Sequence, residues 1–237
     1  MASGVTADGY RTLLGVSISM SEAEIHWREF LLSLKERGLR GIAIITSDDH
    51  ERLKAALKAT SPGAIRQRCQ IHLQRNTLAY VPIVNMRETV AADIRTVFNA
   101  PDQEEAQSLL HLTAEKYRSK ASRLASWMED NIPEGFACFD LPMKFRRRLR
   151  TTNMLERIHK EIKRRTRVAT LFPNEAALLR LVTAILAEAS EERESGRKYF
   201  IIGADQTLRT NLQKNRCFIQ TIFKGFHSFF QENTCPR

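Results

Sequence analysis

Several features that would narrow the class of protein are missing from this sequence of 237 residues. Its four cysteines, Cys69, Cys138, Cys217 and Cys235, show no paired spacing, and no charged and then apolar leader opens the chain, so we expect a cytoplasmic protein with reduced cysteines. No apolar run approaches the roughly 18 residues of a membrane helix, so we expect no membrane-spanning segment. Internal repeats are absent too, and a hydrophobic content of 43% predicts an ordinary globular core.

Acidic residues are scarce in one segment of a chain whose net charge is +10 and whose pI is about 9.8. Between residues 144 and 167, only Glu156 and Glu161 are acidic. The eleven basic residues of this segment are Lys144, Arg146, Arg147, Arg148, Arg150, Arg157, Lys160, Lys163, Arg164, Arg165 and Arg167. Like charges at this density repel one another without a counter-ion, which favours a nucleic-acid partner. The alternative is a solvated charged face.

The first third of the chain alternates between the periodicities of strands and helices, which predicts an α/β sheet. The expected elements are a strand over residues 9–19 after a turn at 7–9, a helix over 21–38, a strand over 41–47, a helix over 51–59, a strand over 66–72 and a helix from 73 to 81. A strand before the turn should pair with the first of these across a hairpin. Ser21 and Glu24 predict a capping box, and Gly38 a helix end.

The rest of the chain is predicted to be helical. Residues 85–131 are amphipathic, with a new helix starting near Pro101, and a loop with two prolines follows. The basic segment then opens a long helix near Asn153, and another helix covers about residues 174–193.

Two carboxylates are placed where they could bind a divalent metal. Asp48 follows an apolar strand, and ligand sites of open α/β sheets gather at the carboxyl ends of strands. Its alternative role, shared with Asp49, is to cap the next helix. Glu156 stands three residues after Asn153, where it could instead stabilise the start of the helix through a capping box and the helix dipole. Together, one acid on a strand and one on a helix could hold Mg²⁺ for phosphodiester chemistry.

The stretch "QRCQIHLQRN", residues 67–76, contains Cys69 and His72 at the spacing of half a zinc site. No second pair follows at the distance of a zinc finger, so packing and hydrogen bonding near the carboxylates is favoured over structural zinc. Further along, Arg157, Lys160 and Arg164 recur at three- and four-residue spacing, together with Arg167, so one helix face could follow a phosphate backbone.

Longer stretches resemble a known family. Residues 47–82, "SDDHERLKAALKATSPGAIRQRCQIHLQRNTLAYVP", and residues 151–188, "TTNMLERIHKEIKRRTRVATLFPNEAALLRLVTAILAE", resemble the mutator-type transposases of bacterial insertion sequences. Residues 21–41, "SEAEIHWREFLLSLKERGLRG", extend the similarity, which covers roughly residues 5–200.

The resemblance implies an RNase H-like α/β core with an α-helical insertion before the last catalytic acid, followed by C-terminal helices. It also implies a DDE triad that binds two Mg²⁺ ions, for which Mn²⁺ can substitute. By position, Asp48 is similar to the second aspartate and Glu156 to the glutamate, and both would be catalytic and bind metal. The matches to the family's C-x-x-H signature and to the arginine and asparagine after it are Cys69, His72, Arg75 and Asn76, an active-site framework. The implied DNA contacts are Arg157, Lys160, Arg164, Arg165 and Arg167.

Four regions follow from this resemblance. They are residues 1–84, part of the RNase H-like core; 85–143, the helical insertion; 144–204, the basic helix with the closing helices; and 205–237, a divergent tail. The family's first aspartate lies on a strand upstream of the hairpin, and nothing before Tyr10 resembles it, since Asp8 falls in the turn. We therefore expect an N-terminally truncated core that lacks its first strand and has little or no activity alone.

The leading hypothesis is a fragment of a transposase that cleaves DNA and transfers strands with Mg²⁺. Its partners would be the insertion-sequence ends, target DNA and further copies of the chain, and its location the cytoplasm, at the nucleoid when it is bound to DNA. The alternative is a non-catalytic remnant that binds DNA or associates with a transposase. A housekeeping nuclease of the same fold would require a complete set of acids.

Overall fold

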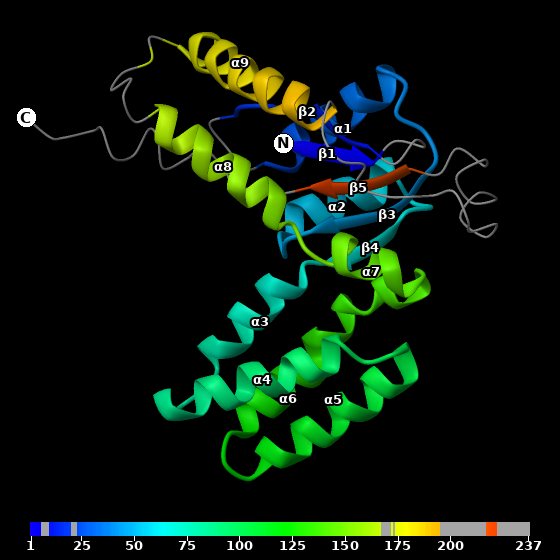
Figure 1. The fold of residues 1–237 in the computed structure, drawn as a ribbon, viewed down its shortest axis with the longest axis vertical. Coiled ribbons are helices and arrows are strands. Elements are labelled where there is room, and N and C mark those ends of the chain that lie inside the picture. The colour runs from blue at the N-terminus through cyan, green and yellow to red at the C-terminus, as the bar shows by residue number, and fades with distance from the viewer. Residues whose placement is uncertain (6–9, 20–22, 167–171, 173, 195–216, 222–237) are drawn as a thin grey trace, which may run out of the picture. The chain divides into compact units, whose positions relative to one another are not determined.

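A computed structural model of the chain describes residues 1–5, 10–19, 23–166, 172, 174–194 and 217–221 (Figure 1). It contains two compact units. The first comprises residues 1–45, 49–64 and 153–237, and the second comprises residues 46–48 and 65–152. The chain has a mixed α/β fold, as the alternating patterns predicted.

The first unit combines strands and helices. Its elements are β1 (Ala2–Val5), β2 (Arg11–Gly15), α1 (Glu24–Glu36), β3 (Ile42–Ser47, whose last two residues belong to the second unit), α2 (Glu51–Thr60), α8 (Asn153–Thr166), α9 (Glu175–Glu194) and β5 (Cys217–Thr221). The predicted hairpin is confirmed, because β1 and β2 pair antiparallel with Val5 opposite Arg11. The turn at 7–9 lies outside the described residues.

Helices cover both faces of the sheet in this unit. Successive residues of a strand point to opposite faces, and Leu14 packs with the buried residues of α1 and α2, whereas Leu13 packs with those of α8 and α9. On the first face, Phe30 and Leu53 are among the buried side chains, and on the second Ile158 is one of them. The unit is therefore layered as helices, sheet and helices.

The strand order of the sheet is β2-β1-β5-β3-β4. β5 pairs antiparallel with β1, so that Ala2 lies opposite Thr221 and Val5 opposite Phe218. A strand from residues 217–221 thus lies between two strands from the first 47 residues of the chain. The sequence patterns predicted no strand there, because they treated this region only as a divergent tail.

Helix boundaries follow the sequence signals closely at most points. α1 ends two residues before Gly38, whose φ of 98° is the left-handed conformation that glycine adopts at helix ends. The predicted capping box is wrong, since the N-cap of α1 is Ala23 and makes no side-chain hydrogen bond. Ser21 itself lies outside the described residues.

The second unit is mainly helical. Its elements are β4 (Ile65–Arg68), α3 (Gln70–Ala79), a 3-10 turn at Val84–Met86, α4 (Arg87–Phe98), α5 (Gln103–Arg118), α6 (Ser122–Asn131), two further 3-10 turns at Ile132–Gly135 and Ala137–Asp140, and α7 (Met143–Leu149). Asp102 caps α5 by accepting a hydrogen bond from the N–H of Glu105 (2.9 Å), which confirms the predicted helix start after Pro101. Buried apolar side chains of α3 to α6, Ile94 and Leu124 among them, form one core.

This unit groups β4 and α3 with the predicted helical insertion, whereas the resemblance to the family placed the insertion at residues 85–143. The predicted four-region division stays a prediction. Among the described residues, no helix is both long and apolar enough to span a lipid bilayer.

Candidate functional site

Asp48 directly follows the last residue of β3, at the strand end where the sequence placed it. The competing assignment, in which Asp48 or Asp49 caps α2, is wrong. The N-cap of α2 is His50, whose Nδ1 accepts a hydrogen bond from the N–H of Leu53 (3.4 Å). Asp49 instead forms an ion pair with Lys54, with 2.5 Å between Oδ1 and Nζ. The carboxylate of Asp48 is therefore not engaged in capping the helix that follows it.

Cys69 lies at the junction between β4 and α3 and is the N-cap of α3. Its N–H donates to the backbone oxygen of Ser47 (2.9 Å), and its thiol accepts a hydrogen bond from the hydroxyl of Thr152 (3.2 Å). The strand predicted over residues 66–72 was too long, because it ends just before Cys69. His72 consequently lies on a helix and not on a strand.

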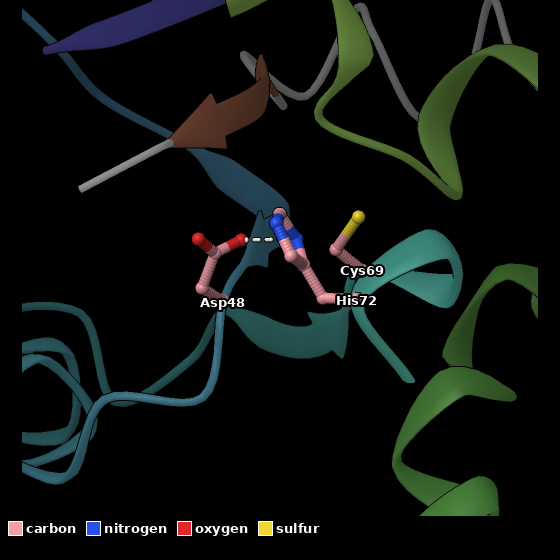
Figure 2. Close-up of side chains that lie close together, drawn as sticks. All are labelled: Asp48, Cys69 and His72. Carbon is pink, nitrogen blue, oxygen red and sulfur yellow. Dashed lines mark ion pairs between the residues drawn. The ribbon is translucent and has the colours of Figure 1, made fainter. Parts of the chain in front are cut away.

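Asp48, Cys69 and His72 come together in the second unit (Figure 2). Nδ1 of His72 lies 2.7 Å from Oδ1 of Asp48, the distance of a close ion pair when the imidazole is protonated. Both side chains keep some access to solvent, at 14% and 17% exposed, whereas Cys69 is completely buried. The ligand atoms of all three lie within 4.8 Å of one another. Two residues three positions apart on one helix thus meet a carboxylate that precedes them by more than twenty residues.

This arrangement favours the charged form of the histidine. Burial would lower the pKa of His72, but hydrogen bonds to Asp48 and Cys69 together with their charges raise that pKa to about 10. For Cys69, burial raises the pKa of the thiol, but the hydrogen bond and charge of His72 outweigh burial and lower it. At neutral pH His72 is therefore an imidazolium, which neutralises the Asp48 carboxylate and holds one of its oxygens in place.

Further contacts hold the backbone around Asp48. Thr46 is fully buried, and its hydroxyl donates to the backbone oxygen of Leu149 (2.6 Å). Nη2 of Arg66 donates to the backbone oxygen of Asp48 itself (3.3 Å). The segment that carries Asp48 is thus tied both to β4 and to the last residue of α7.

The other two predicted framework residues differ from each other. Asn76 follows His72 by about one helical turn; its side-chain nitrogen donates to the backbone oxygen of His72 (3.3 Å), and its oxygen accepts from Nη2 of Arg68 (3.1 Å). Arg68 is almost fully buried and also donates to Oδ1 of Asn131 (3.0 Å). Asn76 therefore supports the helix that carries His72, whereas Arg75 is exposed on that helix.

Glu156 lies on the first turn of α8 and is half-buried. The helix begins at Asn153, as predicted. Asp48 belongs to the second unit and Glu156 to the first, so their joint role as metal ligands stays a prediction.

The basic residues of α8 divide into an exposed and a paired set. Arg157 and Lys160 are exposed, and neither forms an ion pair with any described residue. Glu161, in contrast, holds Nη2 of Arg164 and Nε of Arg165, each at 2.8 Å, and Arg165 also pairs with Glu188 of α9 at 2.5 Å. Arg167 lies outside the described residues. The four predicted DNA contacts that the structure describes therefore differ in how much of their charge is already compensated by acidic side chains.

Two groups of side chains in the second unit have the donors to bind a metal ion. Asp48, Cys69 and His72 offer oxygen, sulfur and nitrogen. Zn²⁺ would accept such a mixed set only with a neutral histidine, whereas Mg²⁺ selects oxygen and would use only the carboxylate beside the protonated His72. The second group, His111, Glu115 and Glu129, lies on the helical surface, where Arg118 pairs with both glutamates at 2.7 Å. The first group is largely buried at the end of a strand, whereas the second lies mostly exposed, so the first group is the candidate site.

Several residues that build the site could not be recognised in the sequence. Thr152 is 83 residues from Cys69. Gln67 and Gln70 both donate to the backbone oxygen of Gly135, at 2.8 and 2.9 Å, and so connect the β4–α3 junction to the 3-10 turn after α6. Threonine and glutamine carry no local signal of such a role, since the partner lies far away in the chain.

Comparison with known proteins identifies close sequence similarity over most of the chain. Residues 1–196 match the family described as "Transposase, Mutator family". The chain is 49% identical over 199 residues to the transposase for insertion sequence element IS406 of Burkholderia multivorans, a match that covers 84% of this chain and 51% of that protein. It is 37% identical to the transposase for ISRM5 of Rhizobium meliloti (84% and 50% covered) and 34% identical to that for IS1081 of Mycobacterium tuberculosis (84% and 48%). The chain spans about half the length of these relatives.

Proposed function

Because this chain belongs to the Mutator family of transposases, we propose that it acts on DNA in transposition, as part of a metal-dependent enzyme that cleaves DNA and transfers strands. The observation that carries this proposal is the carboxylate of Asp48, which stands at a strand end, is not used as a helix cap, and is oriented by an imidazolium 2.7 Å away. A carboxylate held in this way but still partly accessible has the properties of a metal ligand.

The proposed ligands of Mg²⁺ are Asp48 and Glu156. When bound, the metal would activate the attacking oxygen and stabilise the negative charge that develops on the phosphate. His72 fixes one oxygen of Asp48, and the other remains available. Thr152 positions Cys69, which in turn contacts His72, so these residues act through Asp48 and are positioning residues.

The proposed fold of the core is RNase H-like. Its support is the five-stranded sheet, whose strands in the first unit are covered by helices on both faces, with β2 of the β1–β2 hairpin at one edge and Asp48 at the end of β3. By position, two acids of this chain match the proposed set of three. We therefore expect this polypeptide alone to nick DNA weakly or not at all.

The proposed DNA contacts centre on the exposed face of α8. Arg157 and Lys160 are not paired with described acids and can approach phosphates without breaking an ion pair. Arg164 and Arg165 must share their charge with Glu161. Arg167 joins the set by its position in the sequence. We also propose that copies of the chain assemble into multimers that hold two DNA ends together. The proposed location is the cytoplasm, at the nucleoid when the protein is bound to DNA.

The test combines DNA binding with nicking. Binding of a labelled duplex is measured by fluorescence anisotropy at 50–300 mM salt, with Arg157→Ala, Lys160→Ala and the control Lys58→Ala, which removes an exposed charge from α2. Each lost phosphate contact should reduce the slope of log K against log salt by about 0.9, and the control should leave the slope unchanged. Equal effects of all three variants would refute the assignment of α8.

Nicking of supercoiled plasmid is measured in parallel with Mg²⁺ or Mn²⁺, for the chain, Asp48→Asn and Glu156→Gln. Weak nicking that both substitutions abolish would support the catalytic assignment and would show that a third ligand exists elsewhere. Salt-dependent binding that neither substitution affects, without any nicking, would favour the alternative of a non-catalytic DNA-binding protein. The observation that favours this alternative is that Arg157 and Lys160 are exposed and form no ion pair with the residues that the structure describes.

A further inference from the structure

The central strand of the sheet comes from an unexpected part of the chain. β5, residues 217–221, lies between β1 and β3 in the strand order, as Figure 1 shows by the orange-red arrow between the blue strands. Its four pairs with β1 are all antiparallel and in one continuous register, with Ser3 opposite Gln220 and Gly4 opposite Ile219.

The similarity to the family ends before this strand begins. The matched region, residues 1–196, contains β1, β2, β3 and β4 but not β5. Residues shared with the relatives therefore provide two pairs of neighbouring strands, β2-β1 and β3-β4, with one position between the pairs. A segment outside the matched region occupies that position in this chain.

This position must be filled for the sheet to be stable. With β5 in place, every residue of β1 is buried, and Ile44 and Ile45 of β3 are buried as well. Without a strand between them, the backbone N–H and C=O groups along β1 and β3 would lose their partners inside the layered core, where an unpaired polar group is unfavourable. Two exposed hydrophobic strand edges would also invite pairing with other chains.

We propose that the position between β1 and β3 is a strand-accepting site, and that Cys217–Thr221 is a substitute strand that fills it within the same chain. About half the length of the matched relatives lies outside the match. In those proteins, we propose that a segment from the unmatched half occupies the position between β1 and β3. The sequence "CFIQT" suits the role, because it contains two strand-forming hydrophobic residues and a threonine, and neither proline nor charge. Strand addition relies mainly on backbone hydrogen bonds, so an unrelated sequence can serve.

The substitute strand restores pairing but brings no carboxylate, since none of its five residues is acidic. It completes the sheet but adds no acid to Asp48 and Glu156, the two proposed metal-binding acids of this chain. The strand assignment itself stands apart from catalysis, and its test uses neither metal nor DNA, so that its failure and the failure of the proposed function can be told apart.

Disulfide trapping tests the position and the register. In the full chain with Cys217→Ser and Cys235→Ser, Ser3→Cys and Gln220→Cys are combined; directly opposed residues of antiparallel strands have Cα atoms about 4.5–5.5 Å apart, which a disulfide can bridge. Cys69 and Cys138 remain, because both are buried. Mild oxidation should crosslink most of the protein within single chains, as judged by non-reducing electrophoresis and mass spectrometry.

The matched control combines Ser3→Cys with Ile219→Cys, one residue out of register and on the opposite face, and should crosslink at least tenfold less. Adding Ile219→Pro to the Ser3→Cys, Gln220→Cys protein should also abolish the crosslink, because a central strand has no place for a residue without an N–H. Crosslinked dimers would mean that a second copy provides the strand and would overturn the assignment within one chain. Equal crosslinking in both cysteine pairs, or none in either, would overturn the proposed strand.

Discussion

Nδ1 of His72, the third residue of α3, lies 2.7 Å from Oδ1 of Asp48, the residue that follows β3. This contact gives the cysteine and histidine at positions 69 and 72 a role other than a conventional zinc site. Both lie close to the carboxylate of Asp48 in the folded chain. Cys69 begins the helix, His72 projects from its first turn, and the imidazolium fixes the carboxylate. Each residue thus has a distinct role in positioning Asp48.

Removing this imidazole should weaken metal binding. We expect His72→Gln to lower the affinity for Mn²⁺ by about 10- to 100-fold, the usual effect of losing a residue that orients a metal ligand. Titration followed by electron paramagnetic resonance measures the affinity directly and requires no catalytic activity. His26→Gln, at a half-exposed histidine of α1, is the control and should bind as the unmodified chain does. Unchanged affinity in His72→Gln would contradict the positioning role.

The same pair predicts a pH dependence of stability in metal-free buffer. Because the folded protein raises the pKa of His72 to about 10, its contribution to stability is complete below the unfolded value of about 6.5 and is lost as the pH rises towards 10. At pH 6, we expect His72→Gln to lower the free energy of unfolding by about 1.5–3 kcal/mol, the contribution of a hydrogen bond to a charged group. Urea unfolding at pH 6, 8 and 10 measures how this difference declines.

The thiol of Cys69 also affects how stability depends on pH, so a variant without this thiol is the control for the His72 experiment. The pKa of its thiol is lowered, so its contribution to stability grows as the pH rises, opposite to that of His72. Repeating the comparison in a Cys69→Ser background removes this opposing effect. In this background, the stability difference caused by His72→Gln should disappear at a lower pH, because the Cys69 thiol, one of the two groups that raise the pKa of His72, has been removed. A difference that grows with pH in that background would contradict the ion pair with Asp48.

Glu161 is expected to limit DNA binding by α8. It binds both Arg164 and Arg165, and these bonds lower the pKa of its carboxyl to about 2, so that it is ionised under all working conditions. Glu161→Gln should therefore release Arg164, whereas Arg165 keeps its ion pair with Glu188. The variant should raise DNA affinity and steepen the salt dependence by about 0.9 for the new phosphate contact. Fluorescence anisotropy measures both quantities.

The matched control for that substitution is Glu104→Gln, at an exposed acid on α5 that changes the net charge by the same amount. An equal rise in affinity for both variants would mean that only net charge matters. A rise confined to Glu161→Gln would place the DNA on α8.

The core of the second unit should respond strongly to truncation of a buried side chain. Ile94 of α4 is completely buried, so Ile94→Ala should lower the free energy of unfolding by about 2–5 kcal/mol. Leu112 of α5 is 62% exposed, and Leu112→Ala should stay within about 0.5 kcal/mol of the unmodified chain. Urea unfolding followed by circular dichroism measures both values. Similar effects at the two positions would show that α4 does not pack as described.

The sequence by itself determined the features that depend on local pattern. A short, wholly apolar run identified β3, and the helix expected after it is α2. Pro101 and Asp102 marked the start of α5, and the basic run marked the segment that becomes α8. Long stretches of similarity identified the family. The sequence also placed Asp48 at a strand end, because a buried strand must stop where consecutive charged residues begin.

Only the tertiary structure decided which distant residues meet. It assigned the cap of α2 to His50, moved His72 from a strand to a helix and brought Thr152 to Cys69. It also put Cys217–Thr221 into the centre of the sheet. The periodicity of apolar residues indicates which side chains are buried, but it does not indicate which other side chains they contact. Backbone pairing is no more specific, because the N–H and C=O groups of a strand can pair with any strand of suitable geometry. Contacts between residues tens to hundreds of positions apart are therefore fixed by how the whole chain folds.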